Sequence, residues 1–315
     1  MIEVYYFDKA KDQIKKSSID NLSKEINWIR VVDLNEEKIN ILSKYLDIPN
    51  EELRETLEEE ERPKISVKKY LEIIYRAPYY IDDELETLPI YFYLFHDKIV
   101  TIEKKPLKII DLISQKMELN KTKFLFKKGL PYFIYYIIDK INDDFLSRID
   151  KIGAKMDIYE NFSKKEMTVK DVEKIYDQSV ALSFFNQALL ANLEVLNTLK
   201  KGYFRAIPKK DNSLFEEAYY DVLQIIDTEK IQRESVANLI NVHSIITSTR
   251  LNEFMKRLTV IALIMAVPTM LSGLYGMNFI HIPFRDHPYG FYITTVMIFI
   301  FTYSVYYFLT KRELL

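Results

Sequence analysis

Hydrophobic residues follow three different patterns along the chain. Up to about residue 110, short runs rich in β-branched and aromatic residues alternate with polar stretches, which is typical of strands. These runs are Ile2–Phe7, Trp28–Val32, Tyr70–Tyr75, Leu88–Phe95 and Ile99–Glu103. Helical spacing occurs in two further stretches, Glu36–Leu46 and Asn50–Glu61. Residues 1–110 are therefore predicted to form an α/β domain.

The second pattern is helical and follows the first directly. Proline is favoured in the first turn of a helix, so a helix is predicted to open at Pro106. Apolar residues then recur at three- and four-residue spacing up to about Ala206, which predicts two long helices. Breaks are expected near Phe162–Thr168 and at Gly202–Asn212, where turn-forming residues gather. Residues 111–212 are predicted to form a helical bundle.

A single long helix is predicted next. The run Ser213-Leu214-Phe215-Glu216 fits a capping box, in which the serine caps backbone N–H groups and the glutamate reaches back. Neither proline nor glycine occurs from Ser213 to Val267. An unbroken helix over this stretch would be roughly 80 Å long. The alternative is a helix with a break that the composition does not reveal.

The third pattern consists of two long apolar runs near the end of the sequence. Residues 258–276 and 289–310 carry no charged side chain, and each run is long enough to cross roughly 30 Å of hydrocarbon. The long helix over 213–276 is thus predicted to continue into a first span at about 258–276. Residues 277–288 would form an outer loop, 289–310 a second span, and 311–315 a cytoplasmic tail.

Charge around these runs predicts their orientation. Basic residues precede the first span and follow the second, whereas the loop between them has only Arg285, with Asp286 beside it. Because positive residues favour the cytoplasmic side, both termini are predicted to be cytoplasmic. The first residues contain no apolar signal-peptide core, which agrees with this orientation. The sequence therefore predicts a multi-pass protein of the cytoplasmic membrane, in contact with lipid.

Composition excludes several classes of protein. The 315 residues have a net charge of −2, so no strong basic field points to nucleic acid. The absence of cysteine excludes disulfides and thiolate metal sites. No Gly-x-x-x-x-Gly-Lys loop points to a nucleotide, and no set of catalytic side chains points to an enzyme.

The turn between the two apolar runs reads Tyr275-Gly276-Met277-Asn278-Phe279. Together with the lead-in Asn252–Lys256, Pro268 and the stretch 272–279, it resembles the CorA family of magnesium transporters over the first span. The order of α/β domain, helical bundle, stalk helix and hairpin is similar over the full chain. The resemblance implies a homopentameric funnel in which the first span lines a pore and the second faces lipid.

The resemblance further implies a selectivity filter at Gly276, Met277 and Asn278. Mg²⁺ holds its water tightly, so a ring of neutral amide oxygens at Asn278 is expected to bind the hydrated ion without stripping it. Gly276 is expected to permit the tight turn that presents this side chain. The alternative is an ordinary loop asparagine, since asparagine tolerates turns.

A pore lining and a gate are implied along the first span. Met255 and Leu258 match the family's hydrophobic constriction, which gates by dewetting, and Asn252 matches a polar position below it. Small or neutral residues recur above them at helical spacing, namely Ala262, Ala266, Thr269 and Gly273. The alternative is ordinary packing between two membrane helices.

The resemblance also implies that cytoplasmic Mg²⁺ is sensed between subunits. Glu217, early in the long helix, matches a sensing carboxylate, and Asp82 and Asp83 are its predicted partners. The alternative is that these acids are simply solvated. Taken together, these features of the resemblance imply passive Mg²⁺ uptake driven by the membrane potential and gated by cytoplasmic Mg²⁺. A divalent ion gains roughly 4.6 kcal/mol per 100 mV of inside-negative potential.

The outer loop departs from the family pattern, and this leaves alternatives open. Family members commonly carry several acids there, whereas residues 280–290 have only Asp286, together with His281 and His287. Histidines suit Zn²⁺, Co²⁺ or Ni²⁺, so a transporter of those ions is an alternative function. A non-conducting membrane-anchored scaffold or sensor is the alternative from another class.

Overall fold

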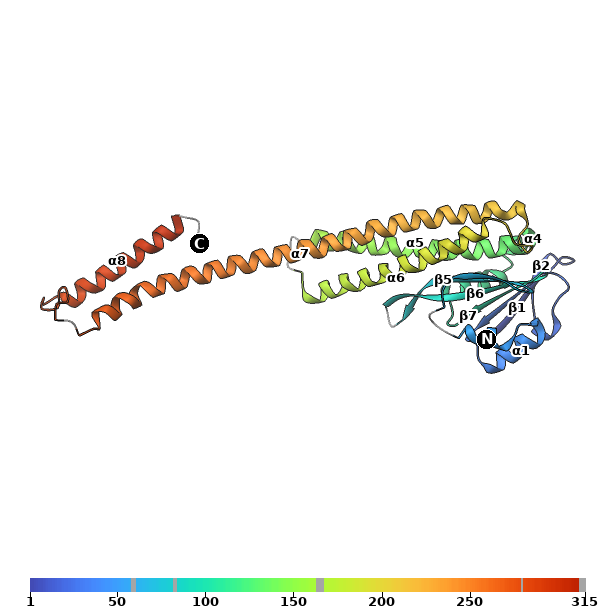
Figure 1. Ribbon diagram of the computed structural model, residues 1–315, viewed down its shortest axis with the longest axis horizontal. Helices are drawn as coiled ribbons and strands as arrows, with labels where there is room; N and C mark the ends of the chain where they lie inside the picture. Colours follow the sequence, from blue (N-terminus) through green and yellow to red (C-terminus); the bar gives the residue numbers. More distant parts are fainter. Residues whose placement is uncertain (58–60, 82–83, 163–166, 279, 312–315) are drawn as a thin grey trace. The chain divides into compact units, whose positions relative to one another are not determined.

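The computed structural model describes residues 1–57, 61–81, 84–162, 167–278 and 280–311 (Figure 1). These residues form two compact units, Met1–Ile240 and Asn241–Leu315. The first unit contains all the strands, and the second contains the end of the longest helix and the last helix.

A seven-stranded sheet lies at the centre of the first unit, in the order β2-β1-β3-β7-β6-β5-β4. Neighbouring strands are antiparallel except for β3 and β7, which run parallel. The strands are β1 (Ile2–Asp8), β2 (Gln13–Ser17), β3 (Asn27–Val32), β4 (Lys64–Val67), β5 (Leu71–Ile81), β6 (Glu84–Leu94) and β7 (Lys98–Glu103). The five predicted strands are confirmed, and β2 and β4 are additional edge strands.

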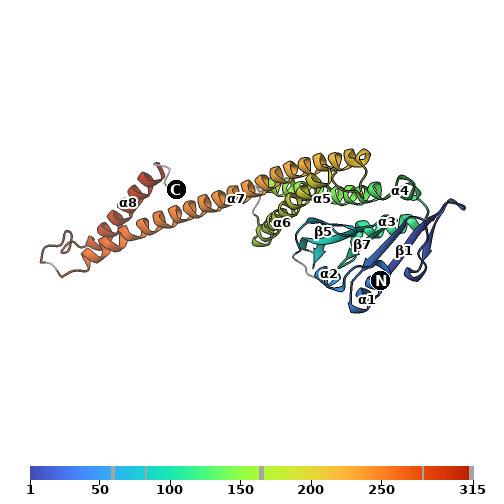
Figure 2. The same cartoon turned by 45° about the vertical axis from the view of Figure 1, so that its right-hand side comes forward.

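Helices cover both faces of this sheet (Figure 2). On one face, α1 (Glu36–Leu46) and α2 (Asn50–Glu55) pack on a core that includes Ile29, Val31 and Leu42. On the other face, the long helices pack on a core that includes Trp28 and Phe92. Because helices cover both faces of the sheet, all six residues of the central strand β3 are buried.

The predicted pair of long helices after Pro106 is wrong in its first part. Two short helices, α3 (Lys108–Glu118) and α4 (Lys123–Lys128), precede α5 (Leu130–Phe162) and α6 (Val169–Leu199). The first helix begins at Lys108 rather than at Pro106. The breaks lie at Asn120 and Gly129, whose φ angles of 56° and 94° are incompatible with a continuing helix. The predicted break after Phe162 is partly outside the described residues.

The helix α7 runs without interruption from Asn212 to Tyr275, through Pro268. It begins one residue before the predicted serine cap, so Ser213 lies in its first turn. After the outer loop, α8 extends from Gly290 to Lys311. The long unbroken helix is confirmed.

Three helices in the described residues are long and apolar enough to cross a membrane. In α6 the apolar window is 44% buried inside the structure, whereas it is 6% buried in α7 and 0% buried in α8. The apolar side chains of α6 therefore pack within the first unit. Those of α7 and α8 require an environment outside the chain, such as lipid or another copy.

A buried ion pair joins the two parallel strands to α3. The Arg30 side chain, 2% exposed, donates hydrogen bonds to both carboxylate oxygens of Glu103, at 2.7 and 3.0 Å. It also donates to Asp111 at 2.6 Å. The Glu103 carboxylate accepts a further bond from the Leu107 N–H at 2.8 Å, just before α3 begins. Each charge in this network is thus paired and hydrogen-bonded, as buried charges require.

Candidate functional site

The outer turn follows directly from the end of α7. The Gly276 N–H donates to the Ser272 carbonyl at 3.0 Å, and the Met277 N–H donates to the Leu274 carbonyl at 3.3 Å. These bonds satisfy two carbonyls at the helix end and close the last turn. Asn278 is the next residue, exposed and outside the helix. The side chain predicted to read the ion is therefore displayed at the tip of a helix.

The predicted reason for glycine at position 276 is wrong for the isolated chain. Gly276 is not among the described residues with positive φ. A Cβ added there would lie 3.4 and 3.5 Å from the carbonyl oxygens of Gly273 and Ser272 in α7, which is ordinary contact. The backbone turn itself thus does not require glycine.

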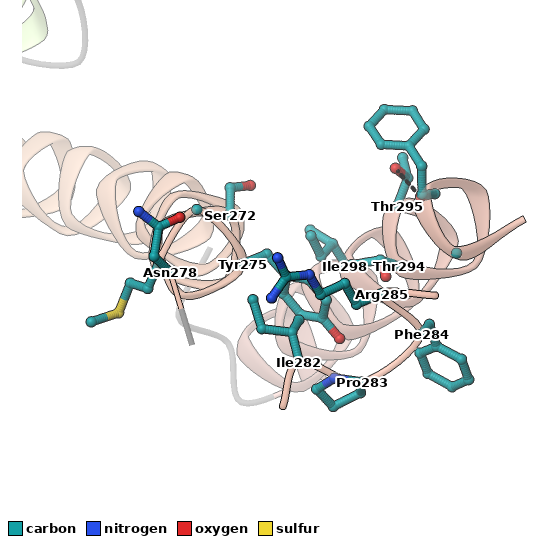
Figure 3. Close-up of a pocket in the computed structure, with 14 residues that line it drawn as sticks. Ser272, Tyr275, Asn278, Ile282, Pro283, Phe284, Arg285, Thr294, Thr295 and Ile298 are labelled. Atoms are coloured by element: carbon teal, nitrogen blue, oxygen red, sulfur yellow. Dashed lines mark hydrogen bonds between the residues drawn. The ribbon is translucent and has the colours of Figure 1, made fainter. Parts of the chain in front are cut away.

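A cavity of about 520 Å³ adjoins the outer turn (Figure 3). It is lined by the end of α7, by the outer turn including Asn278, by loop residues 282–285, and by the start of α8. In Figure 3 the Arg285 guanidinium points from the loop toward the end of α7. Among the described residues that line the cavity, Arg285 is the only one with a charged side chain. Asp286, the next residue in the sequence, does not line it.

The outer loop folds tightly onto the beginning of α8. Phe284 has a φ of 66°, and its carbonyl accepts a hydrogen bond from the His287 N–H at 3.2 Å. A Cβ on Gly290 would lie 2.0 Å from the same carbonyl oxygen, so only glycine allows this approach. The His287 ring accepts a bond from the Tyr289 N–H at 3.2 Å. His287 is thus partly engaged by the loop's own backbone.

The predicted pore residues lie on one face of α7. Successive members are three or four positions apart once Ala262 is included, so they form a stripe along the helix. Each of them is exposed in the single chain, and the set is Asn252, Met255, Leu258, Ala262, Ala266, Thr269 and Gly273. A Cβ added to Gly273 would meet no atom within 4 Å. The stripe carries no charge and is exposed along its length in the described part of the chain, where the Thr269 hydroxyl donates to the Met265 carbonyl at 2.9 Å within the same helix.

Glu217 lies in an acidic cluster that also contains Asp139, Asp143 and Asp221. Burial raises the pKa of Asp221, and the charges of Glu217, Asp139 and Asp143 raise it further. Burial, then the charges of Asp139 and Glu217, likewise raise the pKa of Tyr135. Lys140 offsets part of this charge through ion pairs with Asp139 at 3.0 Å and Asp143 at 2.5 Å.

The predicted partners of Glu217, Asp82 and Asp83, lie outside the described residues. Sequence reasoning missed the aspartates of α5 and α7 that do lie near it. Their signal was the four-residue spacing within each helix, 139 to 143 and 217 to 221, which places each pair on one helix face. Within the described ranges, no group of three or more His, Asp or Glu is arranged to hold a metal ion.

Comparisons with known proteins agree with this architecture. The cobalt/magnesium transport protein CorA of Methanocaldococcus jannaschii is 30% identical over 304 residues, covering 93% of this chain and 95% of the relative. The protein of the same name from Thermotoga maritima is 26% identical, covering 91% and 83%. The complete structure of the CorA magnesium transporter from M. jannaschii superposes with a TM-score of 0.89 at 26% identity, covering 98% of this chain and 97% of that one.

The predicted fold class, an N-terminal α/β domain followed by long helices, is confirmed by that structure. The predicted family is confirmed as well, because the family model described as CorA-like Mg²⁺ transporter protein matches residues 23–312. The chain therefore belongs to the CorA-like Mg²⁺ transporter family, a family of transporters rather than enzymes.

Proposed function

We propose that the protein mediates passive uptake of Mg²⁺, driven by the membrane potential and gated by cytoplasmic Mg²⁺. The observation that carries this proposal is Asn278, displayed at the end of a helix whose exposed stripe is neutral throughout. The names of the relatives, magnesium and cobalt/magnesium transport proteins, support the choice of ion. The proposal includes both termini in the cytoplasm and residues 258–276 and 289–310 as the segments that cross the membrane.

The chemistry of the stripe suits a hydrated divalent ion. Mg²⁺ gives up its water reluctantly, and neutral amide oxygens hydrogen-bond that water without holding the ion permanently. The stripe below Asn278 offers no carboxylate that would trap the ion. Met255 and Leu258 present an apolar ring at the inner end, which closes the path when water leaves it. The driving force is the membrane potential, at roughly 4.6 kcal/mol per 100 mV for a divalent ion.

The direct test is uptake of Mg²⁺ into liposomes that contain the purified protein. At an inside-negative potential, Mg²⁺ entry is expected to exceed that into protein-free liposomes and to fall when the potential is abolished. The second candidate function is transport of Co²⁺, Ni²⁺ or Zn²⁺. It is tested by measuring how strongly each of these ions competes with Mg²⁺ for uptake. That candidate is supported by the cobalt in the relatives' names and by His281 in the loop. Equal entry with and without protein would refute both.

A homo-oligomer, which we propose to be a pentamer, is needed to complete the path. One chain contributes one exposed stripe, and a single stripe encloses nothing. Native mass spectrometry in mild detergent is expected to give five copies. A monomer that conducts would contradict this assembly.

Gly273 offers a sharper test of the same assembly. Since nothing within the chain lies near it, Gly273→Leu is expected to leave the isolated chain folded. If stripes of neighbouring copies face one another, the added side chain blocks the path or separates the helices, and Mg²⁺ uptake falls at least ~10-fold. The matched control is Ser304→Leu on α8, another exposed small residue in an apolar helix. Equal uptake by both variants would place the stripe away from the subunit interface.

Cytoplasmic Mg²⁺ is proposed to act through Glu217, with Asp82 and Asp83 of a neighbouring copy as partners. Burial, and then the charges of Glu217, Asp139 and Asp143, raise the pKa of Asp221, which supports negative charge near Glu217 that Lys140 offsets only in part. Mg²⁺ takes carboxylate oxygens readily and would relieve this repulsion. Binding would favour the closed state only if that state binds the ion more tightly than the open one.

Limited proteolysis checks this regulation. Low-millimolar Mg²⁺ is expected to slow cleavage of the first unit in the full-length protein, and Glu217→Ala is expected to lose most of that protection. Glu216→Ala is the matched control, because Glu216 is exposed, carries the same charge and does not perturb Asp221. Wild-type cleavage that is the same with and without Mg²⁺ would contradict the regulatory role.

A further inference from the structure

A second cavity, of about 450 Å³, lies between α5 and α6 within the first unit. Its described lining consists of two lysines and three uncharged residues, namely Lys155, Ile158, Tyr159, Lys174 and Gln178. No carboxylate is among these lining residues. Small-molecule sites usually have volumes of roughly 300–1,000 Å³. The cavity therefore has the size and the charge to receive a small anion.

Helical spacing explains why these side chains line one cavity. Lys155 and Tyr159 are four positions apart on α5, and each pair with this spacing lies on one helix face. Lys174 and Gln178 have the same spacing on α6. Tyr159 also packs against the hydrophobic core, which includes Met156 of the same helix. The walls of the cavity are thus held by helix packing, and each helix contributes one ammonium group.

Neither lysine of this cavity forms an ion pair within the described part of the chain, unlike Lys140 further back on α5. Lys174 does feel the charge of Asp171 on its own helix. Hydrogen bonds from Thr168 lower the pKa of Asp171 most, and the charge of Lys174 adds a smaller lowering. The Asp171 carboxylate already accepts bonds from the Thr168 hydroxyl and N–H, at 2.7 and 3.0 Å. The ammonium groups of Lys155 and Lys174 are consequently available to a ligand.

Gln178 adds an unsatisfied hydrogen-bond acceptor to the lining. Its Oε1 atom is buried and accepts no hydrogen bond from the described residues. Leaving a buried polar atom unpaired is unfavourable, and most such atoms in folded proteins have a partner. A ligand that fits this cavity therefore carries a hydrogen-bond donor in addition to its negative charge.

We propose that the cavity binds a phosphate group that carries a nearby hydroxyl group, as glycerophosphate does. Phosphate presents several strong acceptor oxygens, so it can contact Lys155 on one wall and Lys174 on the other. The ligand's hydroxyl donates to Oε1 of Gln178. Binding also relieves the repulsion between the two ammonium groups. The site is separate from the proposed path of Mg²⁺ and does not depend on it.

The test is calorimetric titration of the full-length protein in a non-ionic detergent with glycerol 3-phosphate at pH 8. Lys155→Gln and Lys174→Gln are each expected to weaken binding at least ~10-fold, because each removes a charged hydrogen bond. Gln178→Leu is expected to weaken it about 2- to 10-fold, while the affinity for methyl phosphate, which has no hydroxyl on carbon, stays unchanged. The matched control is Lys151→Gln, an exposed lysine one turn earlier on α5 that does not line the cavity.

Glycerophosphate can come from a soluble compound or from the headgroup of phosphatidylglycerol, and nanodiscs distinguish the two sources. The titration is repeated in phosphatidylcholine nanodiscs that contain either phosphatidylglycerol or the same fraction of phosphatidylserine, which has equal charge and no free hydroxyl. Weaker binding of glycerol 3-phosphate with phosphatidylglycerol assigns the site to the lipid headgroup. Equal binding in both assigns it to a soluble ligand.

Two results overturn the proposed site. One is that glycerol 3-phosphate does not bind to the wild type in detergent. The other is that it binds equally well to the wild type and to both lysine variants. Either result leaves the proposed transport of Mg²⁺ unaffected, because none of these titrations measures uptake.

Discussion

Asn278→Ala is expected to abolish most Mg²⁺ uptake into liposomes while the protein still assembles. The amide oxygen is proposed to hydrogen-bond the polarised water on the ion, and alanine offers no acceptor. A hydrogen bond to a charged group contributes about 1.5–3 kcal/mol, so each lost bond lowers occupancy of the filter roughly 10- to 100-fold. Because Asn278 is exposed and outside α7, its removal leaves no cavity in the fold. Native mass spectrometry of the same sample checks that assembly is unchanged.

Asn278→Asp separates the role of the amide from that of an oxygen ligand in general. A ring of carboxylates would bind the ion more tightly and release it slowly, so uptake should saturate at lower Mg²⁺ with a reduced maximal rate. Ile280→Leu, an exposed change of equal volume in the same loop, serves as the control. Unchanged uptake and selectivity in both Asn278 variants would move the filter to another residue.

Arg30→Met is expected to lower the free energy of unfolding by about 3–5 kcal/mol, because it leaves the Glu103 carboxylate buried without its partner. Burial already raises the pKa of Glu103, and Arg30 opposes that rise. Trp28, the single tryptophan of the chain, is fully buried two residues away and reports unfolding by its fluorescence. Denaturant titration of the full-length protein in detergent measures the loss.

The loss of unfolding free energy in Arg30→Met depends on pH in a defined direction. In Arg30→Met the pKa of Glu103 is raised further, so the folded state binds its proton more tightly than the unfolded state does. The variant is therefore least destabilised at low pH, where Glu103 is neutral, and loses stability as pH rises. Arg30→Met combined with Glu103→Leu should recover most of the loss. A midpoint for Arg30→Met equal to that of wild type would show that the pair contributes nothing.

The strands that sequence reasoning found are those in the middle of the sheet. β3 and β7 are buried almost throughout, and most of their residues are β-branched or aromatic, so they stand out as strand-like runs. β2 and β4 lie at the two edges, and β2 buries only Ile14. Edge strands with one neighbour and few buried residues leave no hydrophobic pattern to read. The helix breaks at Asn120 and Gly129 depend on the φ angle of single residues, which periodicity cannot reveal.

The outer turn could be predicted because the two segments that flank it are long, apolar and uncharged. Asn278 lies between two uncharged apolar runs, and that position identified it. The surroundings of Glu217 were not predictable in the same way. Asp139 lies nearly 80 positions earlier and approaches only because α5 packs beside the start of α7. Similarly, only the path of the loop reveals that Arg285, and not Asp286, faces the cavity beside Asn278.

The parallel pairing of β3 with β7 determines the order in which this protein can fold during synthesis. About 65 residues separate Val32 from Lys98, so at ~5–20 residues per second β3 waits several seconds for its partner. Its antiparallel contacts with β1 are local and form first. The apolar part of α7 is synthesised about 150 residues after β7. All the strands of the described sheet are thus synthesised before the apolar part of α7, so the sheet can form before that part of the chain exists.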